Sequence, residues 1–165
     1  MNLIHVRATE EMEDAALLMK GLVESNKDRY PDQIELLDDY YKGSWFLDDS
    51  PRVPVEYSPP LGDVVVAYDE FNPVGTVAIY RMDNTYCELK SMFVPVEHRG
   101  KGVAKALCLD VLSSAKEMGF KVVRLTTGEK QPEARSLYVK VGFNIVTPWE
   151  ANPPDGFDYF ENKIG

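Results

Sequence analysis

Short blocks of apolar residues, or of alternating apolar and polar residues, recur along the chain between stretches rich in Gly, Pro, Asn and Asp. Such blocks are typical of β-strands bounded by turns. Only a few residues separate the second, third and fourth blocks, so these three strands are expected to form a meander. The seven predicted strands cover residues 3–7, 64–68, 74–81, 88–94, 122–125, 145–146 and 157–160.

Two helices are predicted in the N-terminal third, where apolar residues recur every three or four positions. Thr9 suits the N-cap position of the first helix, and glutamates follow it in the first turn. Pro31 suits the first position of the second helix, and Gly43 is placed to end it. Residues 48–60 contain four prolines and are expected to form a loop, whose length is typical of functional segments.

The same periodicity predicts a helix that starts at Gly102 and another at residues 131–141, which Gly142 ends. The helix from Gly102 lies between the predicted strands at 88–94 and 122–125. Because a strand, a helix and a second strand form a crossover unit, these two strands are expected to pair in parallel.

The composition limits the class of protein. The 165 residues suit one domain, residues 1–165, with a sizeable core. A net charge of −9 argues against nucleic acid as a partner, because such binding depends on neutralising phosphates. No apolar run is long enough for a membrane span and no signal peptide is evident, so we expect a cytoplasmic protein. The two cysteines lack metal-site spacing, so we expect reduced thiols and no metal.

A short basic turn joins the strand at 88–94 to the helix that follows it, and this turn contains Gly100 and Gly102. Glycine lets the backbone approach a bound anion, and the N–H groups at a helix start donate to that anion with a favourable dipole. Arg99, Lys101 and Lys105 add positive charge. The strand, turn and helix together predict a site for a pyrophosphate group.

Two common pyrophosphate motifs do not fit this turn. The P-loop pattern G-x-x-x-x-G-K-[ST] is absent from the chain. The dinucleotide pattern fails because Lys105 occupies a position that requires a small residue. The segment Arg99-x-x-Gly102-x-Ala104 instead closely resembles the R/Q-x-x-G-x-G/A signature of the GCN5-related N-acetyltransferase (GNAT) superfamily. In that superfamily the turn holds the pyrophosphate of acetyl-coenzyme A (acetyl-CoA).

A second segment supports this resemblance. Residues 131–143 are similar to the superfamily's N-x-x-A-x-x-L-Y-x-x-x-G-F motif, although Gln131 replaces the usual asparagine. The resemblance covers residues 64–160 and, before them, only the order strand–helix–helix. It implies an α/β (mixed α+β) GNAT fold, a twisted mixed seven-stranded sheet with about four helices on both faces. Acetyl-CoA would lie where the strand of Met92–Val94 and the next parallel strand splay apart.

The chemistry of acetyl transfer and the resemblance together suggest roles for single residues. An amine with a pKa of about 10.4 is almost entirely protonated at neutral pH, so a base must remove its proton, and the departing thiolate needs an acid. Tyr138 matches the superfamily's acid. Glu88 is the candidate base, directly or through a water molecule, and an exposed strand carboxylate or an acceptor anchor is the alternative. The resemblance implies as cofactor-binding residues Met92, Phe93, Val94, Arg99, Gly100, Lys101, Gly102, Val103, Ala104, Lys105 and Gln131.

Two other reactive side chains are not expected to act. His98 lies in the turn that faces the phosphates, so it is poorly placed to be the base. Cys87 is not expected to carry the acyl group, because nothing nearby in the sequence would lower the pKa of its thiol.

A loop near the C-terminus is the predicted acceptor-binding segment. Trp149, Glu150 and Asn152 offer an aromatic ring, a carboxylate and a carboxamide, a set suited to an ammonium group. The stretch 149–153 resembles the aromatic-x-x-Asn-Pro loop of a group of bacterial acetyltransferases with unassigned substrates. We therefore expect a small-molecule amine, cationic or zwitterionic, as the acceptor.

Alternatives to this function remain open. A protein or peptide N-acetyltransferase would need an open groove rather than an enclosed pocket. A non-catalytic regulator that binds acyl-CoA is the second alternative, and the acyl group could be longer than acetyl. Because many relatives dimerise through this end of the fold, the acceptor loops could instead pack against a partner subunit in a homodimer.

Overall fold

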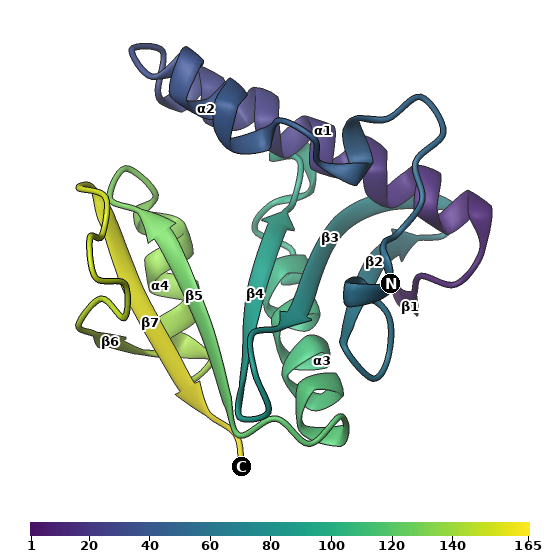
Figure 1. Ribbon diagram of the computed structural model, residues 1–165. Helices are drawn as coiled ribbons and strands as arrows, with labels where there is room; N and C mark the ends of the chain where they lie inside the picture. The colour runs from purple at the N-terminus through teal and green to yellow at the C-terminus, as the bar shows by residue number, and fades with distance from the viewer.

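The computed structural model describes residues 1–165 and contains one seven-stranded sheet in the order β1-β2-β3-β4-β5-β7-β6 (Figure 1). Only β4 and β5 pair in parallel, and every other neighbouring pair is antiparallel. The predicted mixed sheet, its meander and its parallel crossover are therefore confirmed. The strands are β1 (Asn2–His5), β2 (Gly62–Asp69), β3 (Asn72–Arg81), β4 (Tyr86–Phe93), β5 (Val122–Gly128), β6 (Asn144–Val146) and β7 (Phe157–Lys163).

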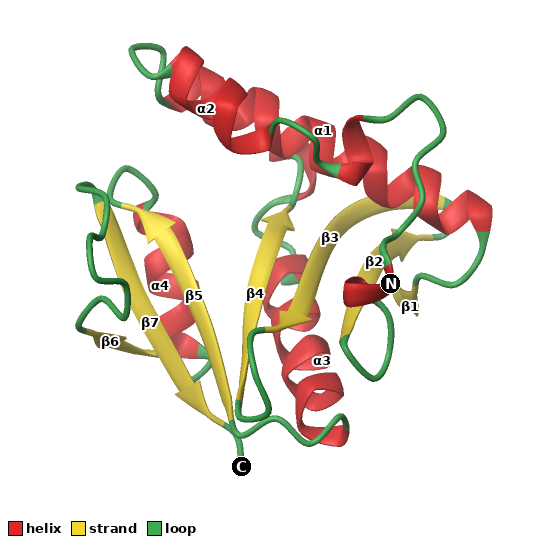
Figure 2. Ribbon diagram, viewed as in Figure 1, coloured by secondary structure: helices red, strands yellow, loops and turns green.

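Four helices cover the two faces of the sheet, as Figure 2 shows, with α1 and α2 on one side and α3 and α4 on the other. None of the helices is long and apolar enough to cross a membrane. The helices are α1 (Thr9–Arg29), α2 (Ile34–Tyr41), α3 (Val103–Glu117) and α4 (Pro132–Lys140). Short 3-10 turns are η1 (Trp45–Leu47), η2 (Val55–Tyr57) and η3 (Val96–His98).

The continuous apolar run of β2 is explained by burial on both faces of the sheet. Val65 belongs to the core that packs under α3, whereas Val64 and Val66 belong to a second core that packs under α1. Successive strand residues point to opposite faces, so a strand covered on both sides needs apolar residues at every position.

Both N-terminal helices begin at residues other than those predicted. The N-cap of α1 is Ala8 rather than Thr9, because the Glu11 carboxylate accepts hydrogen bonds from the N–H groups of Arg7 (2.8 Å) and Ala8 (3.2 Å) and so replaces a capping hydroxyl. The second helix begins at Ile34, and Pro31 lies in the turn before it. Since α1 extends to Arg29, Pro31 is used to end that helix and reverse the chain.

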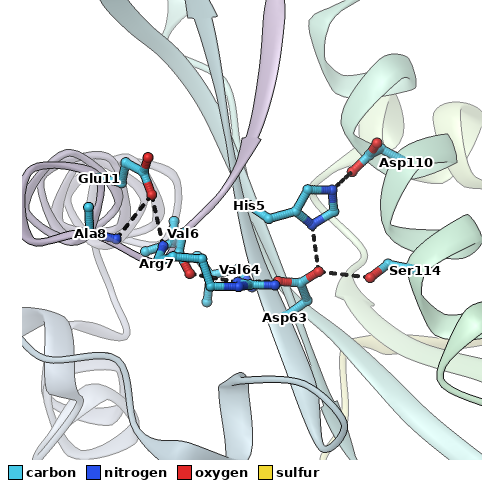
Figure 3. A network of polar contacts seen from close by, with 9 residues as sticks. All are labelled: His5, Val6, Arg7, Ala8, Glu11, Asp63, Val64, Asp110 and Ser114. Atoms are coloured by element: carbon cyan, nitrogen blue, oxygen red, sulfur yellow. Dashed lines mark hydrogen bonds and ion pairs between the residues drawn. The ribbon is translucent and has the colours of Figure 1, made fainter.

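A buried polar network ties the β1–β2 edge to α3 (Figure 3). The side chain of Asp63 is 1% exposed and its carboxylate contacts four groups. These are His5 Nδ1 (2.6 Å), an Arg7 guanidinium nitrogen (2.9 Å), Ser114 Oγ (2.7 Å) and the Val64 N–H (3.0 Å). Because a buried carboxylate must keep its donors, this network holds α3 in place against the sheet.

Candidate functional site

The parallel strands β4 and β5 pair over only three residues and then diverge (Figure 1). The last pair joins Glu88 to Arg124, and we call the diverging segments beyond it the splay. Strands that part leave backbone N–H and C=O groups without a ladder partner. Such an edge can pair with an extended ligand through its main chain.

A β-bulge lies in β4 beside the splay. Ala78 of β3 pairs with Lys90 and Thr76 pairs with Phe93, so Ser91 and Met92 together lie opposite the single residue between them. Ser91 adopts φ of 55°, in the left-handed region that non-glycine residues rarely occupy. Bulges and strained backbone concentrate at functional sites. The bulge leaves the backbone of Ser91 and Met92 without a paired residue in β3 or in β5.

The basic turn leads directly into α3. Gly100 and Gly102 have φ of 74° and 81°, and a Cβ atom added to either glycine would meet nothing within 4 Å. Gly102 is the N-cap of α3 and supplies no side-chain cap. The first-turn N–H groups of Val103, Ala104 and Lys105 therefore have no intrahelical acceptor. Open space over glycines and free N–H donors at a helix start fit a pyrophosphate group.

Three cations surround these donors. Arg99, Lys101 and Lys105 are exposed, and none of them forms an ion pair with a carboxylate of the protein. The Arg99 Nε donates to the carbonyl oxygen of Val94 at 2.9 Å, which pins the turn to the end of β4. His98 and Lys101 line a small cavity of about 160 Å³, and Glu88 is not part of its lining.

Tyr138, the predicted acid, lies on α4 and is 6% exposed. Its ring packs against Phe143 and Phe160, with centroids 5.6 and 6.2 Å away. Its hydroxyl makes no hydrogen bond with a protein group, yet it is not among the side-chain polar atoms that are sealed from solvent and lack a hydrogen bond. The hydroxyl is therefore the reachable part of a buried side chain. Burial raises the pKa of Tyr138 above its ordinary value of 10.0, so the phenol is protonated at neutral pH.

Glu88, the predicted base, belongs to a group that we call the tyrosine–lysine cluster: Tyr40, Tyr57, Tyr80, Glu88 and Lys90. Tyr80 lies directly opposite Glu88 in the β3–β4 ladder, and its hydroxyl donates to Glu88 Oε2 at 2.5 Å. Burial, followed by this hydrogen bond, raises the pKa of Tyr80. The Tyr57 ring lies 5.6 Å from the Tyr80 ring. The cluster thus joins α2, η2, β3 and β4 where the splay begins.

Lys90 is the cation of this cluster. Its ammonium lies 5.7 Å from the ring centre of Tyr40 and 5.4 Å from that of Tyr80. Burial acts to lower the pKa of Lys90, but Tyr40, Glu88 and Tyr57 outweigh it and raise the pKa above 10.5. Lys90 therefore carries a full positive charge at neutral pH, two positions after Glu88 on the same strand face.

Gln131, predicted to contact the coenzyme, joins a set of contacts between α1 and the start of α4. Its amide nitrogen donates to Asn26 Oδ1 at 3.1 Å, and its amide oxygen accepts from Thr127 Oγ1 at 3.2 Å. Arg29 of α1 and Glu133 of α4 form an ion pair at 2.6 Å. These contacts, which we call the α1–α4 bridge, connect the two sides of the molecule beyond the splay.

The predicted acceptor loop packs against β5 and β7. The Trp149 ring lies 4.7 Å from the Tyr159 ring, and the Arg124 guanidinium lies 4.8 Å from the Trp149 ring centre. Glu150 accepts a hydrogen bond from the Tyr159 hydroxyl at 2.5 Å. Burial, then this bond, raises the pKa of Tyr159. Asn152 is exposed.

A partly enclosed cavity of about 210 Å³ lies on the α1 face of the sheet, next to the tyrosine–lysine cluster. Trp45 and Phe46 of η1 and Tyr57 of η2 supply its aromatic walls. Ala78 of β3 and Ser91 of the β4 bulge also line it. Pro54, Glu56 and Tyr57 of the proline-rich loop, together with η1 just before that loop, line one side of this cavity.

The contacts among the residues of the tyrosine–lysine cluster could not be predicted from the sequence. Its members come from α2, η2, β3 and β4, and only the ladder register brings Tyr80 opposite Glu88. The alternation of Glu88 and Lys90 in one strand was a usable signal, because residues two apart share a strand face. Nothing in the spacing pointed to Trp45 or Phe46.

Comparisons with known proteins place the chain in a family. The sequence profile of the acetyltransferase (GNAT) family matches residues 22–143. An uncharacterized N-acetyltransferase of Schizosaccharomyces pombe is 30% identical over 110 residues, which are 65% of this chain and 68% of that protein. Human N-acetyltransferase 8 is 39% identical over 83 residues, 47% of this chain but only 37% of that protein.

A solved structure has the same fold over nearly the whole chain. The PaiA N-acetyltransferase of Thermoplasma acidophilum, in complex with coenzyme A, superposes with a TM-score of 0.72 and 19% identity over 99% of each chain. Acetyl-CoA is accordingly the cosubstrate. With the family profile over most of its length and the splayed sheet and glycine turn in place, the chain belongs to the acetyltransferase (GNAT) family and is an N-acetyltransferase.

Proposed function

We propose that this protein transfers the acetyl group of acetyl-CoA to the amine of a small molecule, by direct attack of the amine on the thioester. The observation that carries the proposal is the cavity of about 210 Å³ beside the tyrosine–lysine cluster. It is partly enclosed and smaller than the roughly 300–1,000 Å³ of pockets for drug-sized ligands. A partly enclosed space of this size favours a small acceptor over a peptide segment.

The coenzyme is proposed to bind along the splay and the basic turn. The N–H groups at the start of α3, with Gly100, Gly102 and the cations of the turn, would hold the pyrophosphate. The backbone of Met92, Phe93 and Val94 would pair with the pantetheine arm. Gln131 would meet that arm through its second amide N–H or its second oxygen lone pair, because its two hydrogen bonds in the α1–α4 bridge use only one of each.

Glu88 and Tyr138 are proposed to move the protons. Glu88 takes the proton of the acceptor ammonium, directly or through water, and the freed nitrogen attacks the thioester carbonyl carbon. An N–H group of the bulge stabilises the negative charge that develops on the carbonyl oxygen. When the carbon–sulfur bond breaks, Tyr138 donates its proton to the thiolate, and the second proton lost by the attacking nitrogen restores the Tyr138 phenol. The products are the acetamide and coenzyme A, and one proton leaves through Glu88.

Trp149, Glu150 and Asn152 stay the proposed acceptor-side loop. Two of them already have partners in the protein, since Trp149 contacts Tyr159 edge to face and lies against Arg124, and Glu150 accepts from the Tyr159 hydroxyl. The loop therefore reaches the acceptor as a preformed wall rather than as a mobile cover. Its carboxylate adds to the negative potential around Glu88.

Thiol release from acetyl-CoA tests this function directly. The protein is mixed with acetyl-CoA and a panel of primary amines, amino acids and peptides, and free coenzyme A is measured with a thiol reagent. We expect turnover with one or more small amines and none with peptides of ten residues. Turnover of peptides alone would contradict the small-molecule proposal, and binding without any turnover would favour the acyl-CoA-binding regulator.

Glu88→Gln is expected to lower kcat/KM at pH 7 by about 100-fold, because general-base catalysis is worth roughly that factor or more. It should also remove the acidic limb of the pH profile of kcat/KM, since the glutamine amide does not titrate. Coenzyme A affinity, measured by calorimetry, should be unchanged. Glu70→Gln, in the exposed turn between β2 and β3, is the matched control and should leave the profile as it is. If the acidic limb of the pH profile persists in Glu88→Gln, Glu88 is not the base.

A further inference from the structure

We infer that Lys90 binds a carboxylate of the acceptor, and that the acceptor is an amino acid whose apolar side chain enters the cavity beside the tyrosine–lysine cluster. This inference rests on the proposed function, because it names the class of small amine that the same site takes. It depends on three features: a cation without an ionic partner, its spacing from Glu88, and the lining of the cavity.

Lys90 is a partly buried cation that lacks an ionic partner. No carboxylate of the protein lies within 4.0 Å of its ammonium. Its near neighbours are the rings of Tyr40 and Tyr80, at 5.7 and 5.4 Å. Withdrawing an ammonium from water without an anion beside it is unfavourable. A site that holds such a charge at the edge of a ligand cavity is suited to an anionic group brought by the ligand.

Glu88 is close to Lys90 but does not neutralise it. The Glu88 carboxylate instead accepts the hydrogen bond of the Tyr80 hydroxyl, at 2.5 Å. The two charged residues are two positions apart in β4, so their Cα atoms are about 7 Å apart on one strand face. This face therefore presents one negative and one positive group side by side.

Only a zwitterion satisfies both groups. An ammonium belongs beside Glu88, and a carboxylate on the same small molecule then lies within reach of Lys90. A simple alkylamine would leave Lys90 without its partner. The N-terminal residue of a protein would do the same, since its carboxyl group is an amide. Charge complementarity across a site sets specificity in this way.

The cavity next to the tyrosine–lysine cluster is the place for the side chain of the amino acid acceptor. Tyr57 lines it and also packs against Tyr80 with its ring tilted by 50°, while Ser91 lines it and directly follows Lys90 in β4. Met19, Trp45, Phe46 and Pro54 supply apolar walls, and Ser44, Tyr57 and Ser91 add polar groups. Its only charged residue is Glu56, which is exposed. A volume of about 210 Å³ with such walls suits one branched or aromatic side chain.

The test compares amino acids with their amides. L-leucine, L-phenylalanine, L-leucinamide and L-phenylalaninamide are assayed by thiol release with the parent protein. We expect kcat/KM for each acid to exceed that for its amide by at least about 30-fold. The amine of an amino acid amide is less basic than that of the free amino acid, so more of it is neutral and able to attack at neutral pH. Without recognition of the carboxylate, the amide would therefore be the better acceptor. A preference for the acid therefore reports recognition of the carboxylate.

Two variants at Lys90 separate charge from packing. Lys90→Met keeps an unbranched side chain without charge and should lower kcat/KM for the acids by about 30-fold, with the amides changed less than threefold. Lys90→Arg keeps the charge and should retain most of the preference. Coenzyme A affinity should be unchanged in both. Ser44→Leu, which narrows the cavity, should raise KM for phenylalanine but not for alanine.

The outcomes distinguish this inference from the proposed function. Equal kcat/KM for acids and amides, or an equal loss for both in Lys90→Met, would overturn the inference and leave acetyl transfer to a small amine intact. Activity confined to amines without a carboxylate would also overturn it. A protein that binds acetyl-CoA but acetylates no small amine would contradict the proposed function itself.

Discussion

Replacing Gly102 with glutamate is expected to weaken coenzyme A binding by at least about 100-fold, as measured by calorimetry. The added carboxylate would occupy the open space over the N-cap of α3, where a Cβ atom meets nothing within 4 Å. That space is proposed to hold the pyrophosphate. The substitution therefore puts a side chain and a like charge at the position of the ligand.

The size of the effect follows from the charge. Two unit charges about 5 Å apart repel by about 3 kcal/mol at an effective dielectric constant of about 20. A loss of roughly 2.7 kcal/mol already corresponds to 100-fold in affinity. Gly102 also has φ of 81°, so a glutamate there costs about 1–2 kcal/mol in backbone strain. That strain is present with and without ligand, so it lowers the free energy of unfolding rather than the affinity.

Gly119 provides the matched control. It follows α3 at the opposite end of the helix, has φ of 90°, and also has open space around an added Cβ. Gly119→Glu should lower stability to a similar extent but leave coenzyme A affinity unchanged. Gly102→Asn, which tolerates a left-handed backbone and adds no charge, should lose much less affinity than Gly102→Glu. Parent-like affinity in Gly102→Glu would place the pyrophosphate elsewhere.

The elements that the sequence predicted well are those whose pattern lies within a few consecutive residues. The run of valines in β2 needs burial on both faces, and the structure supplies one core on each side. Gly142, at φ of 101°, stops α4 because few other residues adopt that backbone. The glycine turn at Gly100 and Gly102 could be located from spacing alone, since its geometry depends on residues adjacent in sequence.

The starts of α1 and α2 were predicted wrongly because two local signals competed. Thr9 and Glu11 both suit the first turn of α1, and the carboxylate became the cap. Pro31 suits both a helix start and a helix end. The length of α1, which extends to Arg29, decided between them. That length depends on packing of α1 across the sheet, which no short window of sequence contains.

The acceptor side was the least predictable part of the site. Tyr40, Tyr57, Tyr80 and Lys90 meet only because η2 and α2 fold over the β3–β4 ladder. Their separation along the chain hides this contact from any periodicity. Glu88 could be identified from its place before the apolar run of β4. Its hydrogen bond with Tyr80 could not be predicted, because it depends on the register in which β3 and β4 pair.

Tyr138→Phe is expected to lower kcat by about 100-fold or more with little change in coenzyme A affinity. Loss of a general acid affects the step in which the thiolate leaves, and not the binding of the ground state. Stability should change little, because the hydroxyl makes no hydrogen bond with the protein and the ring stays packed against Phe143 and Phe160. Steady-state thiol release and chemical denaturation measure the two effects.

Tyr68→Phe is the control, since it removes a hydroxyl from another buried tyrosine far from the splay in the sheet order. The Tyr68 hydroxyl donates to Asp14 at 2.6 Å, so its loss should lower the free energy of unfolding by about 1 kcal/mol and leave kcat unchanged. The two variants should thus show opposite patterns. If Tyr138→Phe keeps parental kcat, Tyr138 only packs in the core. Because burial raises the pKa of Tyr138 above 10.0, loss of its proton should not limit kcat anywhere below that pH.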